Sequence, residues 1–279
     1  MSSTGLEGRS VIVTGAAAGI GRAAALRFAE AGSKVLVADL NKEGAEQTVQ
    51  AIESAGGVAC AVAGDLSDQR VVDEVVTTAV KAFGGLDVLV NNAGITDSMS
   101  ALADTDDAEW ERVVRINLTA PFLLTRAVLP HMLAGGHGAI VFTASEAGLR
   151  GSAAGAAYTA SKHGIVGLVK NLAVMYRKQG IRTNAIAPGG TRTNILANSM
   201  ADDPAKLASL ANVLGGAPGQ AGGEEAPHGP TVLRDYIRTN PGKGSSPEEQ
   251  AAAIVFLASD AASNINGAIL PVDDGWSAV

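Results

Sequence analysis

The sequence predicts an α/β protein with a single doubly wound parallel sheet of about seven strands and helices on both faces. Three observations predict this fold class. Short β-branched runs alternate with helical stretches along the chain, the runs are continuously apolar, and the first run leads into a glycine-rich turn. Continuously apolar strands are typical of parallel sheets that helices cover on both sides. We therefore expect residues 1–279 to form one domain.

The first half of the chain supplies four of the expected strands. Helical stretches separate these runs, and each stretch stops at a glycine, the residue that most readily ends a helix. We expect strands at 10–14, 34–39, 58–63 and 86–90, and helices at 20–31, 42–55 and 68–83.

The second half repeats the alternation and adds an insertion. We expect helices at 107–133, 157–178 and 248–258, with Pro121 and Pro130 as local distortions of the first, and strands at 139–143, 183–187 and 268–272. The insertion covers residues 198–236, with an amphipathic helix at 205–214 and a Gly- and Pro-rich stretch at 215–230. We expect a lid over the substrate site, and the alternative is a surface excursion or a subunit contact.

Composition excludes several classes of protein. Apolar residues are 47% and charged residues 18%, which argues against disorder, and the net charge of −7 has the wrong sign for a nucleic-acid or anionic-membrane partner. Cys60 is the single cysteine, and the chain shows neither a signal peptide nor a sufficiently long apolar run for a membrane helix. We expect a soluble cytoplasmic protein that acts on a small molecule.

The turn after the first run has features of a phosphate-binding loop. Gly15, Gly19 and Gly21 allow the backbone to approach a ligand closely, and Ile20 lies in the first turn of the helix that follows. A glycine-rich turn can also serve packing alone. The position of Asp39 at the end of the second strand favours the binding interpretation, because a carboxylate there suits a ribose 2′-hydroxyl.

Tyr158 and Lys162 stand four residues apart near the start of a predicted helix, so they share one face. At ~4 Å and an effective dielectric constant of ~20, the attraction between phenolate and ammonium is ~4 kcal/mol, or about three pKa units. The pair therefore predicts a tyrosine pKa near ~7, suited to general acid/base catalysis. Taken alone, the pair is better explained as an incidental pair on a surface helix.

Two further polar residues belong near this helix face. Ser145 follows the strand at 139–143 and should point into the crevice at the carboxyl edge of the sheet. Asn117 lies inside a helix, where asparagine is unfavourable unless its side chain has a partner. The four histidines show no metal-ligand spacing, and no Ser–His–Asp arrangement is visible, so we expect no metal.

Taken together, these residues resemble the short-chain dehydrogenase/reductase family, a family with the Rossmann fold. The resemblance covers nearly the whole chain through TGAAAGIG (14–21), Asp65 in GDL, NNAG (91–94), Asn117, Ser145, YTASK (158–162) and PGGTRT (188–193). It implies a catalytic tetrad of Asn117, Ser145, Tyr158 and Lys162. It also implies cofactor contacts by Gly15, Gly19, Ile20, Gly21, Asp39, Asp65, Leu66, Asn92, Ala93, Gly94, Tyr158, Lys162, Pro188, Gly189, Thr191 and Thr193.

The resemblance further implies a mechanism. Tyr158 exchanges a proton with the substrate oxygen, Lys162 lowers the pKa of Tyr158 and holds the nicotinamide ribose, Ser145 orients the substrate oxygen, and Asn117 holds a water that relays protons. Two positions depart from the usual pattern: the strand-end motif is TAS, with a single serine, and Thr191 stands where an aliphatic residue is common. A homotetramer is also implied.

We therefore expect an oxidoreductase that transfers a hydride between NAD(H) and a secondary alcohol or ketone. NAD is expected because a 2′-phosphate would meet Asp39, while Ala17, Ala18 and Leu40 offer no compensating positive charge. One alternative is a 3-oxoacyl-thioester reductase, which shares the same motifs. A second, from another class, is a non-catalytic regulatory protein that binds the nicotinamide cofactor.

Overall fold

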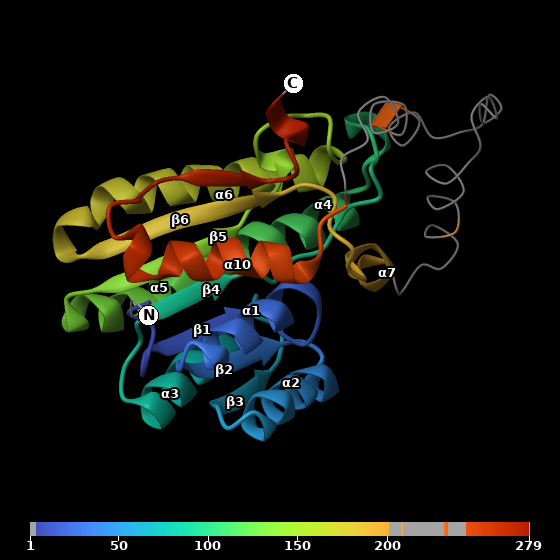
Figure 1. Ribbon diagram of the computed structural model, residues 1–279. Helices are drawn as coiled ribbons and strands as arrows, with labels where there is room; N and C mark the ends of the chain where they lie inside the picture. The colour runs from blue at the N-terminus through green and yellow to red at the C-terminus, as the bar shows by residue number, and fades with distance from the viewer. Residues whose placement is uncertain (1–3, 201–207, 209–231, 234–243, 279) are drawn as a thin grey trace.

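The computed structural model describes residues 4–200, 208, 232–233 and 244–278. Its centre is a seven-stranded parallel sheet with the order β3-β2-β1-β4-β5-β6-β7 (Figure 1). The strands are β1 (Ser10–Thr14), β2 (Lys34–Asp39), β3 (Val58–Ala63), β4 (Val88–Asn91), β5 (Gly138–Thr143), β6 (Ile181–Pro188) and β7 (Ile269–Val272). The predicted doubly wound sheet of about seven strands is therefore confirmed.

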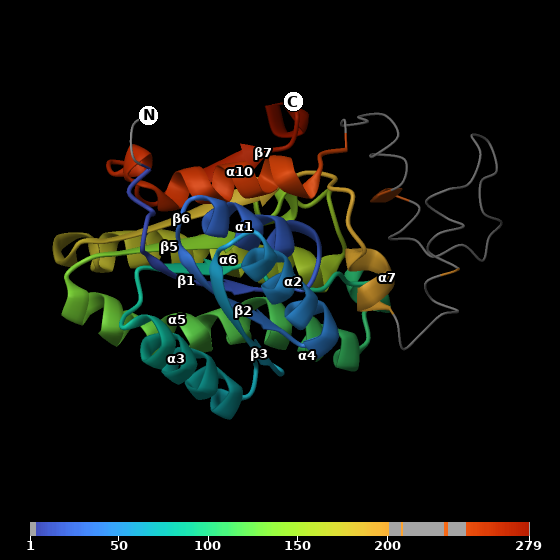
Figure 2. The same ribbon diagram turned by 60° about the horizontal axis from the view of Figure 1, so that its bottom comes forward.

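Helices form a layer on each face of this sheet (Figure 2). One layer contains α1 (Gly19–Glu30), α2 (Lys42–Ser54) and α10 (Pro247–Ala258). The other contains α3 (Gln69–Phe83), α4 (Asp107–Val114), α5 (Ala120–Gly135) and α6 (Ala156–Met175). Neighbouring strand residues face opposite layers: Val11 and Val13 pack with α1, whereas Ile12 packs with α3 and α5. This burial on both faces explains why the strands are continuously apolar.

The strand order reverses between β1 and β4, and Asn92 joins the strands there. Its backbone N–H donates to Thr14 Oγ1 at 2.9 Å, and its side-chain amide donates to the Thr14 carbonyl at 3.0 Å. From the other side, Thr143 Oγ1 donates to Asn92 Oδ1 at 3.1 Å. In open α/β sheets, ligands bind at the carboxyl ends of the strands beside such a reversal. Asn92 thus fixes the floor of the expected site.

The predicted boundaries agree with the structure within two residues except in two helices, and three of the differences have physical reasons. β4 begins at Val88, because the Asp87 carboxylate turns back to accept a hydrogen bond from the Ser10 N–H. The helix predicted at 107–133 consists of α4, a π-helical turn at Arg115–Thr119 and α5. The helix predicted to reach 178 ends at Met175 and continues as a 3₁₀ turn at Arg177–Gln179.

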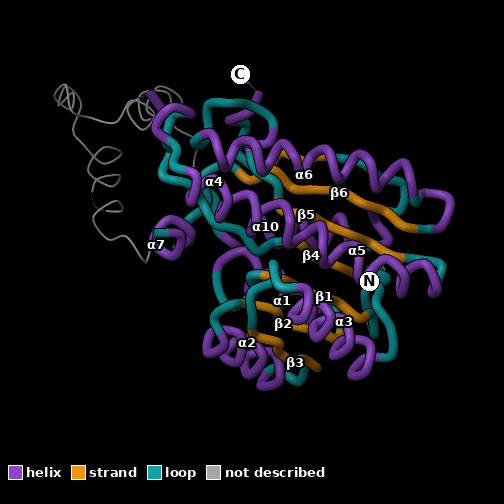
Figure 3. The backbone as a smooth tube through the Cα atoms, turned by 180° about the vertical axis from the view of Figure 1, so that it is seen from behind, coloured by secondary structure: helices purple, strands orange, loops and turns teal. Residues whose placement is uncertain are grey.

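The run Asp107–Gly135 is long and apolar enough to cross a membrane by length and composition alone. Core helices of globular proteins also pass this test. Here Leu124 and Val128 of α5 are buried in the cluster between the helices and the sheet. Seen from behind, α5 lies along the strands (Figure 3). The run therefore serves as a core helix of this domain.

The predicted insertion at 198–236 begins at the end of α7 (Ile195–Ser199). Apart from residues 198–200, 208 and 232–233, it lies outside the described residues. The stretch at 215–230 falls entirely there, and so does the helix at 205–214 except for Ala208, which is helical.

Candidate active site

The glycine-rich turn between β1 and α1 packs so closely against neighbouring backbone that it has no space for side chains at Gly15 and Gly21. Gly15 has φ +64°, and a Cβ there would lie 2.8 Å from the Ala93 Cα. A Cβ on Gly21 would collide with the Gly15 carbonyl oxygen. Ala18, the N-cap of α1, provides no side-chain hydrogen bond to the first turn. The N–H groups of the first turn of α1 can therefore bind an anion, so the glycine-rich turn fits a pyrophosphate.

Asp39 ends β2 beside this turn with its carboxylate firmly held. Its Oδ2 accepts from the Ala17 N–H and its Oδ1 accepts from the Asn41 N–H, both at 2.9 Å. The carboxylate therefore has a fixed position next to the phosphate-binding turn. Leu40, the following residue, is 75% exposed. Asp39 therefore lies at the predicted position, at the end of β2 beside the glycine-rich turn.

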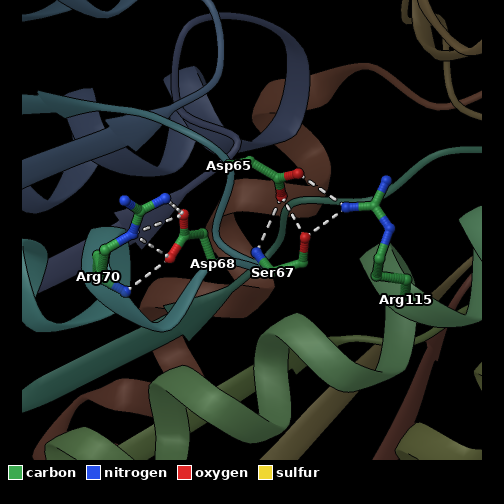
Figure 4. A network of polar contacts seen from close by, with 5 residues as sticks. All are labelled: Asp65, Ser67, Asp68, Arg70 and Arg115. Atoms are coloured by element: carbon green, nitrogen blue, oxygen red, sulfur yellow. Dashed lines mark hydrogen bonds and ion pairs between the residues drawn. The ribbon is translucent and has the colours of Figure 1, made fainter.

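Asp65 lies beyond the end of β3 in a polar network with Ser67 and Arg115 (Figure 4). Its Oδ1 accepts from the Ser67 N–H at 2.9 Å, and its Oδ2 pairs with Arg115 at 2.7 Å. Burial alone would raise the pKa of Asp65, but the hydrogen bonds from Ser67 and Arg115 and the charge of Arg115 outweigh it and lower the pKa. The neighbouring Leu66 is buried. Arg115 thus connects the Asp65 loop to the π turn that contains Asn117.

The two remaining cofactor segments also border the same site. A Cβ on Gly94 would lie 3.2 Å from Asn117 Oδ1 and 3.7 Å from Lys162 Nζ, so this glycine backs directly onto the predicted tetrad. On the opposite wall, a Cβ on Gly19 would lie 3.3 Å from Thr193 Cγ2. The segment Pro188–Thr193 therefore faces the glycine-rich turn. Within it, the Thr191 hydroxyl lies 3.0 Å from the Ser245 hydroxyl, and a Cβ on Gly189 would crowd Asp273.

The π-helical turn explains the asparagine inside a helix. Asn117 is 1% exposed, and both ends of its amide are used. Its Oδ1 accepts from the Ile95 N–H, and its Nδ2 donates to the Ile95 carbonyl, both at 2.9 Å. Nδ2 also donates to Ser161 Oγ at 3.2 Å, and Ser161 in turn donates to the Tyr158 carbonyl at 2.7 Å. Asn117 thus has the partners that its position requires, and they lead to Tyr158.

The other three predicted catalytic residues lie together. Ser145 lies close enough to Tyr158 to lower the pKa of its phenol, and Lys162 Nζ lies 5.4 Å from the centroid of the Tyr158 ring. Lys162 Nζ donates to the Thr143 carbonyl at 2.8 Å, which ties α6 to the end of β5. The structure therefore brings a hydroxyl, a phenol and an ammonium group together at the carboxyl edge of the sheet. Such a set can bind a substrate oxygen and exchange a proton with it.

The predicted tyrosine pKa near 7 is wrong for the structure as it stands. Burial raises the pKa of Tyr158 to about 12, with the hydrogen bond from Ser145 opposing the shift and the charge of Asp97 adding to it. Burial also lowers the pKa of Lys162 to about 8. The prediction counted the attraction between the two charges but not the loss of hydration, which favours the neutral form of each group.

Two buried acids in this region were missed as individual residues. Asp97 accepts hydrogen bonds from the first turn of α6, and Glu146 directly follows Ser145. Burial raises the pKa of Glu146, although its bond with Arg150 at 2.8 Å opposes this. The sequence gives one weak signal for each, because Asp97 follows the strand β4 and Glu146 follows the strand β5, at the edge where a ligand is expected. Among the described residues, no cluster of three metal-ligating side chains occurs.

Comparisons with known proteins agree with this geometry. The family model described as short chain dehydrogenase matches residues 9–204. The chain is 38% identical over 274 residues to 3β-hydroxysteroid dehydrogenase 2 of Eggerthella lenta, covering 98% of this chain and 96% of that protein. It is 40% identical over 271 residues to cis-4-hydroxycyclohexanecarboxylate dehydrogenase of Sinomonas cyclohexanicum, covering 97% of each.

A solved structure shows the same fold. It is a candidate NAD(P)-dependent gluconate 5-dehydrogenase from Beutenbergia cavernae with NADP bound at low occupancy. The TM-score is 0.79 at 36% identity, and the match covers 100% of both chains. Its family binds a nicotinamide cofactor, and the turn at Gly15 and Gly21 fits the pyrophosphate of such a cofactor. This chain belongs to the short-chain dehydrogenase/reductase family and is an oxidoreductase of secondary alcohols or ketones.

Proposed function

We propose that this protein is an NAD(H)-dependent dehydrogenase of cyclic secondary alcohols. The observation that carries the choice of NAD is the Asp39 carboxylate, which Ala17 and Asn41 hold beside the phosphate-binding turn. A fixed carboxylate there can accept hydrogen bonds from a ribose diol, whereas a 2′-phosphate would meet a like charge. The nearest lysine, Lys42, is 77% exposed and pairs with Glu46 at 3.8 Å, so it offers little compensation.

The catalytic roles follow from the contacts of the four side chains. When bound, the nicotinamide ring supplies or accepts the hydride. Tyr158 exchanges a proton with the substrate oxygen, and the hydroxyl of Ser145, which lies beside Tyr158, binds that same oxygen. Both groups meet at one point because Ser145 lies at the end of β5 and Tyr158 in the first turn of α6.

Lys162 and Asn117 keep the proton donor in place. Lys162 bonds to the Thr143 carbonyl and lies beside the Tyr158 ring, so as an ammonium group it stabilises the phenolate form. The side-chain amide of Asn117 donates hydrogen bonds to the Ile95 carbonyl and to Ser161 Oγ. We therefore propose that Asn117 positions Ile95 and Ser161. A water that relays protons would lie beside the Asn117 amide.

The substrate class is supported by the names of two relatives, a hydroxysteroid dehydrogenase and a hydroxycyclohexanecarboxylate dehydrogenase. In both names the reacting alcohol belongs to a compound built on rings. The test is a panel of cyclohexanols, 3β-hydroxysteroids, open-chain secondary alcohols and acetoacetyl thioesters, each assayed with NAD(H) and NADP(H). We expect the fastest turnover with a cyclic alcohol and NAD. A preference for the thioester would instead support a 3-oxoacyl-thioester reductase, and no turnover would support a regulatory cofactor-binding protein.

Two further properties complete the proposal. Large apolar side chains are exposed on α4, α5 and α6: Trp110, Phe122, Val174 and Met175. Burial of such side chains favours association with a second copy, so we propose a homotetramer, which sedimentation equilibrium tests directly. We also propose that the enzyme works in the cytoplasm, where the half-buried Cys60 stays reduced, and cell fractionation tests this.

A further inference from the structure

The helix that carries Tyr158 begins without a cap of its own. Gly155 occupies the N-cap position of α6 and has no side chain to bond to the first turn. A distant residue supplies the cap instead. Asp97, in the loop after β4, accepts from the Gly155 N–H through Oδ1 at 3.1 Å and from the Tyr158 N–H through Oδ2 at 2.9 Å. A carboxylate at a helix N-terminus stabilises it through these bonds and through the helix dipole.

Two backbone features are fitted to this carboxylate. A Cβ on Gly155 would lie 2.6 Å from Asp97 Oδ2, so only glycine allows the carboxylate to approach. Met99 has φ +59°, a left-handed conformation that costs a non-glycine residue about 1 kcal/mol or more. Its N–H donates to Asp97 Oδ1 at 3.0 Å, which offsets part of that cost. The loop is therefore strained in the conformation that brings Asp97 to α6.

The residues on either side of Asp97 connect the same loop to other parts of the site. Ile95 bonds to Asn117 through both its N–H and its carbonyl. The Thr96 N–H donates to Ser199 Oγ on α7 at 2.8 Å, and the Ser98 N–H donates to Glu109 on α4 at 2.7 Å. The segment 95–98 therefore holds Asn117 and Tyr158 at a fixed distance from each other.

We propose that Asp97 is the positioning residue for Tyr158 and sets where the phenol meets the substrate oxygen. The inference rests on the proposed acid/base role of Tyr158. Asp97 is 1% exposed. Three backbone N–H groups donate to its carboxylate and offset the cost of burying it.

The charge of Asp97 gives this role a second, measurable effect. Burial raises the pKa of Asp97, and the nearby charge of Glu109 adds to that shift, while its three hydrogen bonds oppose it. In its ionised form, Asp97 disfavours the phenolate and raises the pKa of Tyr158. Glu109 and Tyr158 are the titratable groups that interact with Asp97 within the described part of the chain. Neutralising Asp97 should therefore lower the pKa of Tyr158.

The test uses Asp97→Asn in the full-length enzyme, with the best cyclic alcohol of the panel as substrate. An asparagine keeps most hydrogen bonds by placing its oxygen at Oδ1, which serves Met99 and Gly155. Its NH₂ group then faces the Tyr158 N–H, so this bond alone is lost. We expect kcat to fall about tenfold or more, because small displacements of a catalytic group cost that much. The Kd for NADH should stay within about twofold, because the phosphate-binding turn and Asp39 are unchanged.

Two readouts separate positioning from a general loss of structure. The pH profile of kcat should shift to lower pH in Asp97→Asn, and hydrogen exchange should increase at the backbone amides of 155–162. The matched control is Asp68→Ala, which removes the acidic N-cap of α3 and its bond to the Arg70 N–H. It should lose a similar amount of thermal stability and keep its kcat.

The outcomes are distinct. An unchanged kcat and pH profile in Asp97→Asn would overturn the proposal. If that variant fails to fold, Gly155→Ala presses on the carboxylate from the other side, and an unchanged kcat there would overturn the proposal as well. Full activity of Tyr158→Phe would instead refute the acid/base role, and hydrogen exchange at 155–162 would still show whether Asp97 caps α6.

Discussion

Cofactor preference depends on one carboxylate, and the structure allows the effect to be estimated. A 2′-phosphate about 4 Å from Asp39 would cost up to ~4 kcal/mol at an effective dielectric constant of ~20. Asp39 is half-buried, so solvent reduces this figure. A remaining penalty near 3 kcal/mol corresponds to a preference for NADH over NADPH of about 100-fold, at 1.4 kcal/mol per factor of ten.

The perturbation is Asp39→Asn. Asparagine keeps one oxygen for the N–H of Ala17 or Asn41, so the phosphate-binding turn loses one hydrogen bond rather than two. Binding of NADH should weaken by roughly tenfold, because a charged acceptor for the ribose is lost. Binding of NADPH should strengthen, and the two affinities should become similar. Adding Leu40→Arg at the exposed neighbouring position should then favour NADPH.

The assay is fluorescence titration of both reduced cofactors at fixed ionic strength. Glu43→Gln is the matched control: it removes one negative charge from the first turn of α2, where Glu43 bonds to Gln47. Its NADH/NADPH ratio should remain that of the wild type. Equal affinities of the wild type for the two cofactors, or an unchanged ratio in Asp39→Asn, would refute the electrostatic explanation.

Three further predictions concern catalysis and stability. Tyr158→Phe should lower kcat by about 100-fold or more with NADH affinity near normal, whereas Lys162→Ala should reduce both, as steady-state kinetics and titration would show. Burial lowers the pKa of Lys162 to about 8, so between about 8 and its unfolded value of 10.5 the unfolded chain binds more protons. Without added cofactor, urea unfolding should therefore show stability rising over this range by about 3 kcal/mol. An equal rise in Lys162→Met would contradict this origin. Arg115→Ala removes a half-exposed ion pair with Asp65, so the loss of stability should stay below about 1 kcal/mol, and a larger loss in the same urea assay would show that the network has another role.

Local chemistry in the sequence was sufficient to predict the sheet and its ligand edge. The strands β1, β2 and β3 have the predicted boundaries. β1 and β2 are buried parallel strands, which must be apolar on both faces, and β3 is an apolar but partly exposed edge strand. The need for glycine at positions 15 and 21 was also predicted, since the backbone there lies too close to another segment for a side chain.

Contacts between distant segments decided the rest. Asn117 in the π turn bonds to Ile95, and Asp97 caps α6 at Tyr158. Both contacts join residues far apart in the chain, so no local sequence pattern predicts them. The shift of the Tyr158 pKa was predicted in the wrong direction. Spacing along a helix shows which charged groups are neighbours, but it does not show how much hydration they lose. Hydration depends on everything packed around a group, and only the tertiary structure determines that packing.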